Sequence, residues 1–148
     1  MALLRRVSLN REGAKRMVER KLQVIIADNE PVVRELVDRH VSERGHAVHQ
    51  AATGADCLKL MRNKACDLVF LDLVMPGIDG ETALEVIHRR YPDTIVVVVS
   101  SLDDDQVIDK ILKQGAHAYL RKPVTREHIE DVIRRVERQK DGGGTTER

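Results

Sequence analysis

Short apolar runs alternate with longer stretches of mixed polarity along most of the chain. Five of these runs predict β-strands, at residues 22–27, 47–51, 68–72, 95–100 and 118–120. The third and fourth runs are nearly continuous in Val, Ile, Leu and Phe, which predicts strands that are buried on both faces. Strands that alternate with longer amphipathic segments are typical of βαβ units around a parallel sheet.

The intervening stretches carry apolar residues at helical spacing, and local signals mark where each helix begins and ends. The predicted starts are Pro31, Thr53 with Asp56 three residues later, and the acidic run 103–105; the predicted ends are Gly45 and Gly115. Right-handed crossovers between five such units predict an α/β fold. We expect a flavodoxin-like, doubly wound parallel sheet of five strands and five helices, with strand order 2-1-3-4-5.

The two ends of the chain differ from this regular pattern. Up to Lys21 there are seven basic and two acidic residues, so we assign residues 1–20 to a basic N-terminal extension. We expect it to be frayed and solvated; the alternatives are a basic helix that docks on a partner, or a true start at Met17. Residues 21–139 form the predicted domain, and residues 140–148, with three consecutive glycines, form a predicted flexible tail.

Composition narrows the class of protein. The 148 residues are 42% hydrophobic and 33% charged, which fits one soluble globular domain. The formal net charge of +1 gives no electrostatic footprint for direct nucleic-acid binding. The two cysteines need no disulfide, no apolar run is long enough for membrane insertion, and no signal peptide is present, so we expect a cytoplasmic protein.

Four polar residues stand where predicted strands end. Asp28 follows the first strand, Asp72 ends the third, Ser100 ends the fourth and Lys122 follows the fifth. Parallel strands meet at one sheet edge, so these side chains should lie together. Carboxylates supply the oxygen ligands that Mg²⁺ prefers, and a lysine supplies a point charge for phosphate. A carboxylate beside both cations can attack a phosphoryl group.

Three stretches carry a family resemblance: residues 24–31, 67–80 and 115–123. With these motifs the chain resembles the receiver domain of response regulators in two-component signalling, over about residues 21–139. The resemblance implies a role for each matching residue: Asp72 as phosphoacceptor, Asp28 as an acidic metal-pocket residue, the Met75 backbone carbonyl as a metal contact, Ser100 as switch hydroxyl, Tyr119 as rotating aromatic and Lys122 as the phosphate-contacting lysine. It also implies a cis bond between Lys122 and Pro123.

By this resemblance the chain is a phosphorelay signal-transduction switch and not an enzyme, beyond assisting its own phosphorylation and dephosphorylation with Mg²⁺. A sensor histidine kinase or a histidine phosphotransfer protein would supply the phosphoryl group, and a downstream target protein would read it. A homodimer through the fourth helix, fifth strand and fifth helix is a further expectation. No output domain follows residue 139, as in stand-alone chemotaxis receivers, although a piece of a longer regulator would look the same.

Asn29 departs from the family pattern, because the family places a second acidic residue there as a direct Mg²⁺ ligand. An amide oxygen can coordinate Mg²⁺ but brings no negative charge, so we expect weaker Mg²⁺ binding unless Asp28 or Glu30 compensates. The alternative function is therefore a pseudo-receiver adaptor that works without phosphorylation. Val74 and Leu102 would flank the phosphoryl group and slow its hydrolysis.

Other functions of the same fold class fit less well. Two Tyr, one Phe and no Trp leave little to stack on a flavin. An aspartyl-phosphate phosphatase would need an aspartate where Val74 stands, and no glycine-rich dinucleotide or nucleoside-triphosphate motif is present. His46 and His49 are interpreted as surface residues and not as metal ligands.

Overall fold

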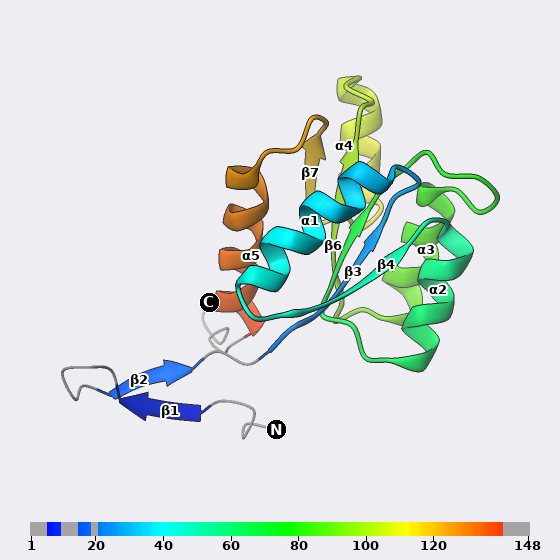
Figure 1. The fold of residues 1–148 in the computed structure, drawn as a ribbon. Helices are drawn as coiled ribbons and strands as arrows, with labels where there is room; N and C mark the ends of the chain where they lie inside the picture. The colour runs from blue at the N-terminus through cyan, green and yellow to red at the C-terminus, as the bar shows by residue number, and fades with distance from the viewer. Residues whose placement is uncertain (1–5, 10–14, 19–20, 141–148) are drawn as a thin grey trace.

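The computed structural model describes residues 6–9, 15–18 and 21–140, and its main body is a five-stranded parallel sheet (Figure 1). The strands are β3 (Gln23–Ala27), β4 (Ala47–Ala51), β5 (Leu68–Leu71), β6 (Ile95–Ser100) and β7 (Ala118–Arg121). They lie in the order β4-β3-β5-β6-β7, with every neighbouring pair parallel. Numbered among themselves, these strands have the order 2-1-3-4-5, so the predicted doubly wound fold is confirmed.

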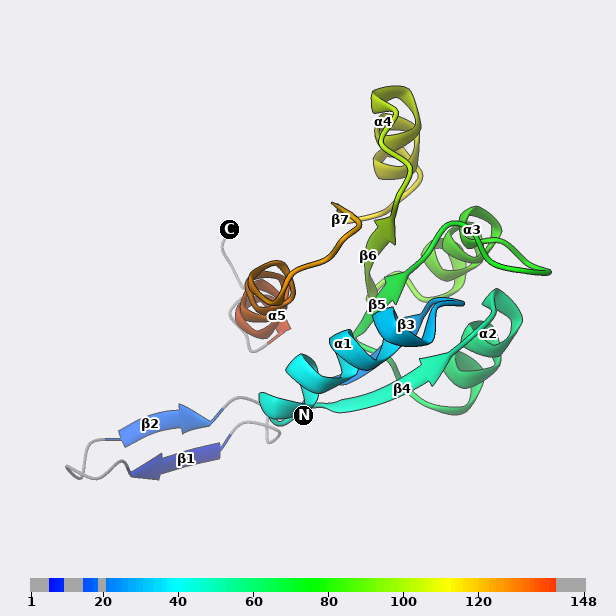
Figure 2. The ribbon, with the colours of Figure 1, turned by 45° about the horizontal axis from the view of Figure 1, so that its top comes forward.

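Five helices cover the two faces of this sheet (Figures 1 and 2). One face carries α1 (Pro31–Glu43) and α5 (Arg126–Lys140), which pack against each other. The other face carries α2 (Gly54–Asn63), α3 (Gly80–Arg90) and α4 (Asp105–Lys113). None of the helices that the structure describes combines the length and apolar character of a membrane-spanning segment.

Side-chain alternation along the strands divides the core into two halves. In β3, Val24 and Ile26 join the cluster under α1 and α5, whereas Ile25 and Ala27 join the cluster under α2 and α3. All residues of β5 and β6 are buried, which confirms that their continuous apolar sequence reflects burial on both faces. The carboxyl ends of the central strands are therefore held in a tightly packed frame.

The predicted helix boundaries agree with the hydrogen bonds at the helix ends. Thr53 Oγ1 accepts the Asp56 N–H at 3.1 Å at the start of α2, and Asp104 Oδ1 accepts the Gln106 N–H at 2.7 Å at the start of α4. Gly45 and Gly115, after α1 and α4, have φ values of 92° and 116°. These left-handed conformations explain why glycine ends both helices.

The structure differs from the sequence predictions mainly in the N-terminal extension. Within the N-terminal extension, β1 (Arg6–Leu9) and β2 (Lys15–Val18) pair as antiparallel strands, where we expected a frayed segment and considered a basic helix as an alternative. Of the predicted tail, only Lys140, which ends α5, lies among the described residues. Three predicted strand ranges differ from the observed strands by one residue at one end. The bond from Lys122 to Pro123 is cis, as the family resemblance implied.

A buried charged network lies at the opposite end of the sheet from the predicted site. Glu137 of α5, 3% exposed, accepts hydrogen bonds from Arg44 Nε at 3.0 Å, from Arg44 Nη2, and from His46 Nε2 at 2.7 Å. His46 Nδ1 accepts the Leu22 N–H at 3.0 Å, so the proton of the neutral ring lies on Nε2 and is donated to Glu137. The network joins α5 to the start of β3 and to the connection between α1 and β4.

The prediction that His46 is a surface residue is wrong, because these two hydrogen bonds hold its ring in the interior at 7% exposure. His49 is half-buried, and its Nε2 lies 3.4 Å from Gln23 Oε1. Burial alone raises the pKa of Glu137, but the hydrogen bonds from Arg44 and His46 outweigh burial and leave that pKa lowered.

Replacing this buried carboxylate should weaken the fold in a pH-dependent way. We expect Glu137→Gln to reduce the free energy of unfolding by about 2 kcal/mol at neutral pH, because Arg44 loses a charged partner. A lowered native pKa stabilises the fold above the ordinary glutamate pKa, and this stabilisation is lost as pH falls through the lowered pKa. Urea denaturation should therefore show the gap between variant and wild type closing in acid.

The matched control is Glu127→Gln, an exposed glutamate on the same helix. Its unfolding free energy should stay close to that of the wild type. An equal loss in both variants, or a gap that does not change with pH, would contradict the role assigned to Glu137.

Candidate functional site

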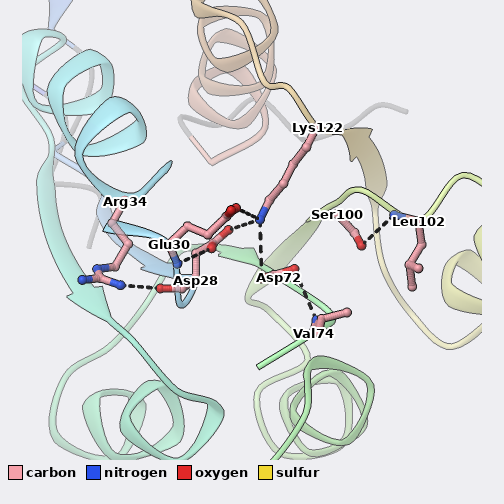
Figure 3. A network of polar contacts seen from close by, with 8 residues as sticks. All are labelled: Asp28, Glu30, Arg34, Asp72, Val74, Ser100, Leu102 and Lys122. Atoms are coloured by element: carbon pink, nitrogen blue, oxygen red, sulfur yellow. Dashed lines mark hydrogen bonds and ion pairs between the residues drawn. The ribbon is translucent and has the colours of Figure 1, made fainter. Parts of the chain in front are cut away.

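Four predicted site residues meet at the carboxyl edge of the sheet (Figure 3). Asp28, Asp72 and Lys122 come directly after β3, β5 and β7, and Ser100 is the last residue of β6. Backbone hydrogen bonds continue the ladder past the strand ends: Asp28 N–H to Ala51 O at 3.0 Å, Asp72 N–H to Ala27 O at 2.9 Å and Lys122 N–H to Ser100 O at 2.9 Å. The sheet itself therefore fixes the backbones from which these side chains extend.

Lys122 is the centre of the charged contacts at this edge (Figure 3). Its Nζ lies 2.7 Å from Glu30 Oε1, 3.0 Å from Asp28 Oδ2 and 3.5 Å from Asp72 Oδ2. One ammonium group therefore faces three carboxylates, two of which are almost fully buried: Asp28 is 0% exposed and Asp72 is 3% exposed. The cluster carries an excess of negative charge, which suits it to bind a cation.

The environment changes the pKa of both central groups. Burial, followed by the charge of Asp28, raises the pKa of Asp72; the Val74 N–H and the Lys122 ammonium offset part of this rise. Burial alone would lower the pKa of Lys122, but its hydrogen bonds to Glu30 and Asp28 outweigh burial and leave that pKa raised. Asp72 is thus a carboxylate whose charge is unfavourable in the protein, beside a lysine that stays protonated.

The carboxylates are oriented by nearby backbone groups. Asp28 Oδ1 accepts the Glu30 N–H at 2.9 Å, and Asp72 Oδ1 accepts the Val74 N–H at 3.3 Å. Arg34 Nη1 donates to the Asp28 carbonyl at 2.6 Å, which ties the first turn of α1 to the site.

Gly80 brings α3 against the same loop, since its N–H donates to Leu73 O at 2.9 Å. A Cβ at that position would overlap the Asp72 carbonyl oxygen, so only glycine fits there.

Ser100 and Tyr119 are connected through the two peptide groups of Leu102. Ser100 Oγ accepts the Leu102 N–H at 3.2 Å, and the Tyr119 hydroxyl donates to the Leu102 carbonyl at 2.7 Å. Ser100 is fully buried, whereas Tyr119 is half-buried at the edge of the core. If the Ser100 side chain rotated, the Leu102 N–H would lose its hydrogen-bond partner. Because the Leu102 carbonyl accepts the Tyr119 hydroxyl, a shift of Leu102 would also affect Tyr119.

The carboxylates of this cluster are of the kind that Mg²⁺ prefers as ligands. Asp28 Oδ2 is buried, and the contact that the structure gives it is the ion pair with Lys122 Nζ at 3.0 Å. No three His, Cys, Asp or Glu side chains of the described ranges are arranged to hold a metal ion. Mg²⁺ needs only one or two carboxylates because it keeps several waters, so Asp28 and Asp72 suffice.

The other two predicted metal contacts differ in their surroundings. Met75, whose backbone carbonyl is a predicted ligand, is 7% exposed in the loop after β5. The Asn29 side chain is exposed and has no hydrogen bond with the described residues. Val74 and Leu102, predicted to flank the phosphoryl group, are 58% and 41% exposed and lie beside Asp72 and Ser100 (Figure 3).

Sequence reasoning identified the charged residues but not all of their contacts. It named Glu30 without its short contact to Lys122, and it assigned no role to Arg34 or to the peptide groups of Leu102. The position of Arg34, one turn into a helix that starts beside Asp28, is the signal that could have indicated its contact.

The raised pKa of Asp72 predicts that its charge destabilises the metal-free protein. A raised native pKa gives stability that is present below the ordinary aspartate pKa and is lost as pH rises through the raised pKa. Asn is neutral at every pH, so Asp72→Asn in a chelator should raise the free energy of unfolding by about 1 kcal/mol at neutral pH. The exposed control Asp103→Asn should leave it unchanged. A destabilised Asp72→Asn variant at neutral pH would show that the Asp72 charge is well compensated, contrary to this prediction.

Known proteins resemble the chain over most of its length. It is 35% identical over 117 residues to the response regulator GacA of Pseudomonas aeruginosa, a match that covers 78% of this chain and 55% of that protein. It is 33% identical over 120 residues to the transcriptional regulatory protein AfsQ1 of Streptomyces coelicolor, covering 78% and 53%. The chain therefore spans about half the length of these curated relatives.

Solved structures and a family profile agree with these relatives. The receiver domain of NtrX from Brucella abortus superposes with a TM-score of 0.72 at 27% identity, over 77% of this chain and 97% of that one. A CheY-like receiver domain protein from Methanospirillum hungatei shares the fold with a TM-score of 0.75 at 23% identity, over 81% and 97%. The profile of the response regulator receiver domain matches residues 24–134. The chain belongs to the response regulator receiver domain family.

Proposed function

We propose that this receiver domain accepts a phosphoryl group on Asp72 and signals through protein contact. One observation carries the proposal: Lys122 Nζ lies between the buried carboxylates of Asp28 and Asp72 at the carboxyl edge of the sheet. Two adjacent buried carboxylates are costly unless a cation compensates them, so their presence beside a single lysine favours a functional role. The family membership of residues 24–134 supports the same role.

In the proposed reaction an Asp72 carboxylate oxygen attacks phosphorus, and the bond from phosphorus to the donor breaks with its electron pair leaving on the donor. With a phosphohistidine of a sensor kinase or a phosphotransfer protein as donor, an imidazole is released. Mg²⁺, held by Asp28, Asp72 and the Met75 carbonyl, would neutralise charge on the phosphoryl oxygens. Lys122 supplies a second positive charge to those oxygens, and the Val74 N–H orients Asp72.

Switching would follow from the hydrogen bonds of Leu102. A phosphoryl group adds about −1.5 to −2 charge and three strong acceptors at Asp72. Ser100 would turn its hydroxyl toward these acceptors and release the Leu102 N–H, which shifts the carbonyl that Tyr119 contacts. Tyr119 would then turn inward, so that a local charge changes the surface of β7 and α4.

The partners follow from this surface. We infer that a downstream target, or a second copy of the chain, contacts α4, β7 and α5. Leu112 of α4 is 39% exposed, and Leu102, in the loop before α4, is 41% exposed. The chain itself is proposed to be a switch that assists only its own phosphorylation and dephosphorylation. We place it in the cytoplasm, where the free thiols of Cys57 and Cys66 stay reduced; burial raises the pKa of each to about 12.

Intact-mass analysis after incubation with acetyl phosphate and Mg²⁺ tests the proposal. Wild type should gain one phosphoryl group, and Asp72→Asn should gain none because the attacking oxygen is lost. The control Asp103→Asn, an exposed carboxylate after β6, should be labelled like wild type. Labelling that persists in Asp72→Asn would place the phosphoacceptor elsewhere and overturn the proposal.

The exposed amide of Asn29 favours one alternative function, an adaptor that works without phosphorylation. If the missing charge limits metal binding, Asn29→Asp should tighten Mg²⁺ binding about tenfold, measured by calorimetric titration. Asn63→Asp, the same substitution at an exposed position of α2, should have no effect. An unlabelled wild type beside a labelled Asn29→Asp variant would establish the adaptor; unchanged Mg²⁺ affinity would show that Asn29 does not limit the site.

A further inference from the structure

Glu30 makes the shortest charged contact in the site, and the phosphoacceptor chemistry does not require it. Its Oε1 lies 2.7 Å from Lys122 Nζ, against 3.0 Å for Asp28 Oδ2 and 3.5 Å for Asp72 Oδ2. Glu30 precedes α1 at the N-cap position but makes no side-chain capping hydrogen bond. Its carboxylate is therefore engaged by the lysine and not by the helix.

This contact opposes the step proposed for Lys122. A phosphoryl group on Asp72 offers three acceptor oxygens and needs the lysine protons that now point to other carboxylates. In Figure 3 the lysine reaches Glu30 and Asp28 on one side and Asp72 on the other. The Glu30 carboxylate also repels an incoming anionic phosphodonor, so both effects act in the same direction.

We propose that Glu30 is a positioning residue that holds Lys122 back from Asp72, so that phosphorylation requires the contact between Glu30 and Lys122 to break. The inference rests on the proposed phosphoacceptor function and adds a restraint that sets how readily this site is labelled. The contact lies partly in solvent, since the Glu30 side chain is 58% exposed and the Lys122 side chain 14%. Its influence is therefore modest and sensitive to salt.

The opposite role for Glu30 would be to replace the acid that is missing at Asn29 and to bind Mg²⁺. The geometry disfavours this role, because Glu30 Oε1 is held by Lys122 and the Glu30 N–H is donated to Asp28 Oδ1. The two roles predict opposite signs for one substitution. A Glu30→Gln variant that loses a restraint is labelled faster, whereas one that loses a metal ligand is labelled more slowly.

The experiment compares wild type, Glu30→Gln and Glu35→Gln. Glu35 is an exposed glutamate of α1, and Glu35→Gln changes the net charge by the same amount as Glu30→Gln. At low ionic strength, the initial rate of labelling by acetyl phosphate with saturating Mg²⁺ should rise about two- to fivefold in Glu30→Gln and stay at the wild-type value in Glu35→Gln. Beryllofluoride should bind Glu30→Gln tighter by a similar factor, and high salt should reduce both gains.

A separate Mg²⁺ titration distinguishes the cause, because Glu30→Gln should bind Mg²⁺ no more tightly than wild type. If wild type is labelled on Asp72 but Glu30→Gln is equal or slower, or if Glu35→Gln accelerates equally, the inference is overturned and the proposed function stands. If neither wild type nor Glu30→Gln is labelled, both are overturned. If Glu30→Gln is labelled and wild type is not, the contact between Glu30 and Lys122 blocks phosphorylation completely, which supports the inference.

Discussion

A single ammonium group among three carboxylates is the interaction on which the carboxyl edge of this domain depends. Asp28 and Asp72 are buried at neighbouring strand ends, where two uncompensated negative charges would repel each other at short range. Lys122 compensates this charge only in part, and its backbone is held in place by a hydrogen bond to Ser100. The charge balance of the site thus depends on the parallel sheet, because the sheet fixes the backbone of Lys122 directly after β7.

The charge of the buried Asp72 carboxylate lowers the stability of the fold but serves the proposed function. A neutral side chain would suit its buried surroundings better, and the raised pKa of Asp72 expresses that preference. A group whose charge is poorly compensated is, however, well prepared to bind a cation or to gain a phosphoryl group. Departures from the best local choice of residue are expected at functional sites for this reason.

Sequence reasoning predicted the sheet order and the four polar strand ends because both follow from backbone geometry. Parallel strands with short loops bring their ends together whatever the side chains do. Asp28, Asp72, Ser100 and Lys122 could therefore be placed from the sequence alone. The contact of Glu30 with Lys122 could not be placed in this way. It depends on side-chain conformations that join residues 92 positions apart.

The buried network of Glu137 was missed for a different reason. A glutamate in a charged helix is usually solvated, yet Glu137 follows Ile133 by one helical turn and so lies on the same stripe as the core residues. Its position on that stripe was therefore a readable signal. His46 carried no comparable signal, because its burial depends on a glutamate 91 residues away.

The same network has a mechanical consequence for α5. The helix begins four residues after Lys122, while its far end is clamped by Glu137 to Arg44 and His46. A rod that is fixed at one end and pulled at the other swings about the fixed end more readily than it slides along its axis. Displacements that start at Lys122 should therefore be largest at the first turn of α5 and decrease toward Glu137. The helix would then rotate about its C-terminal end.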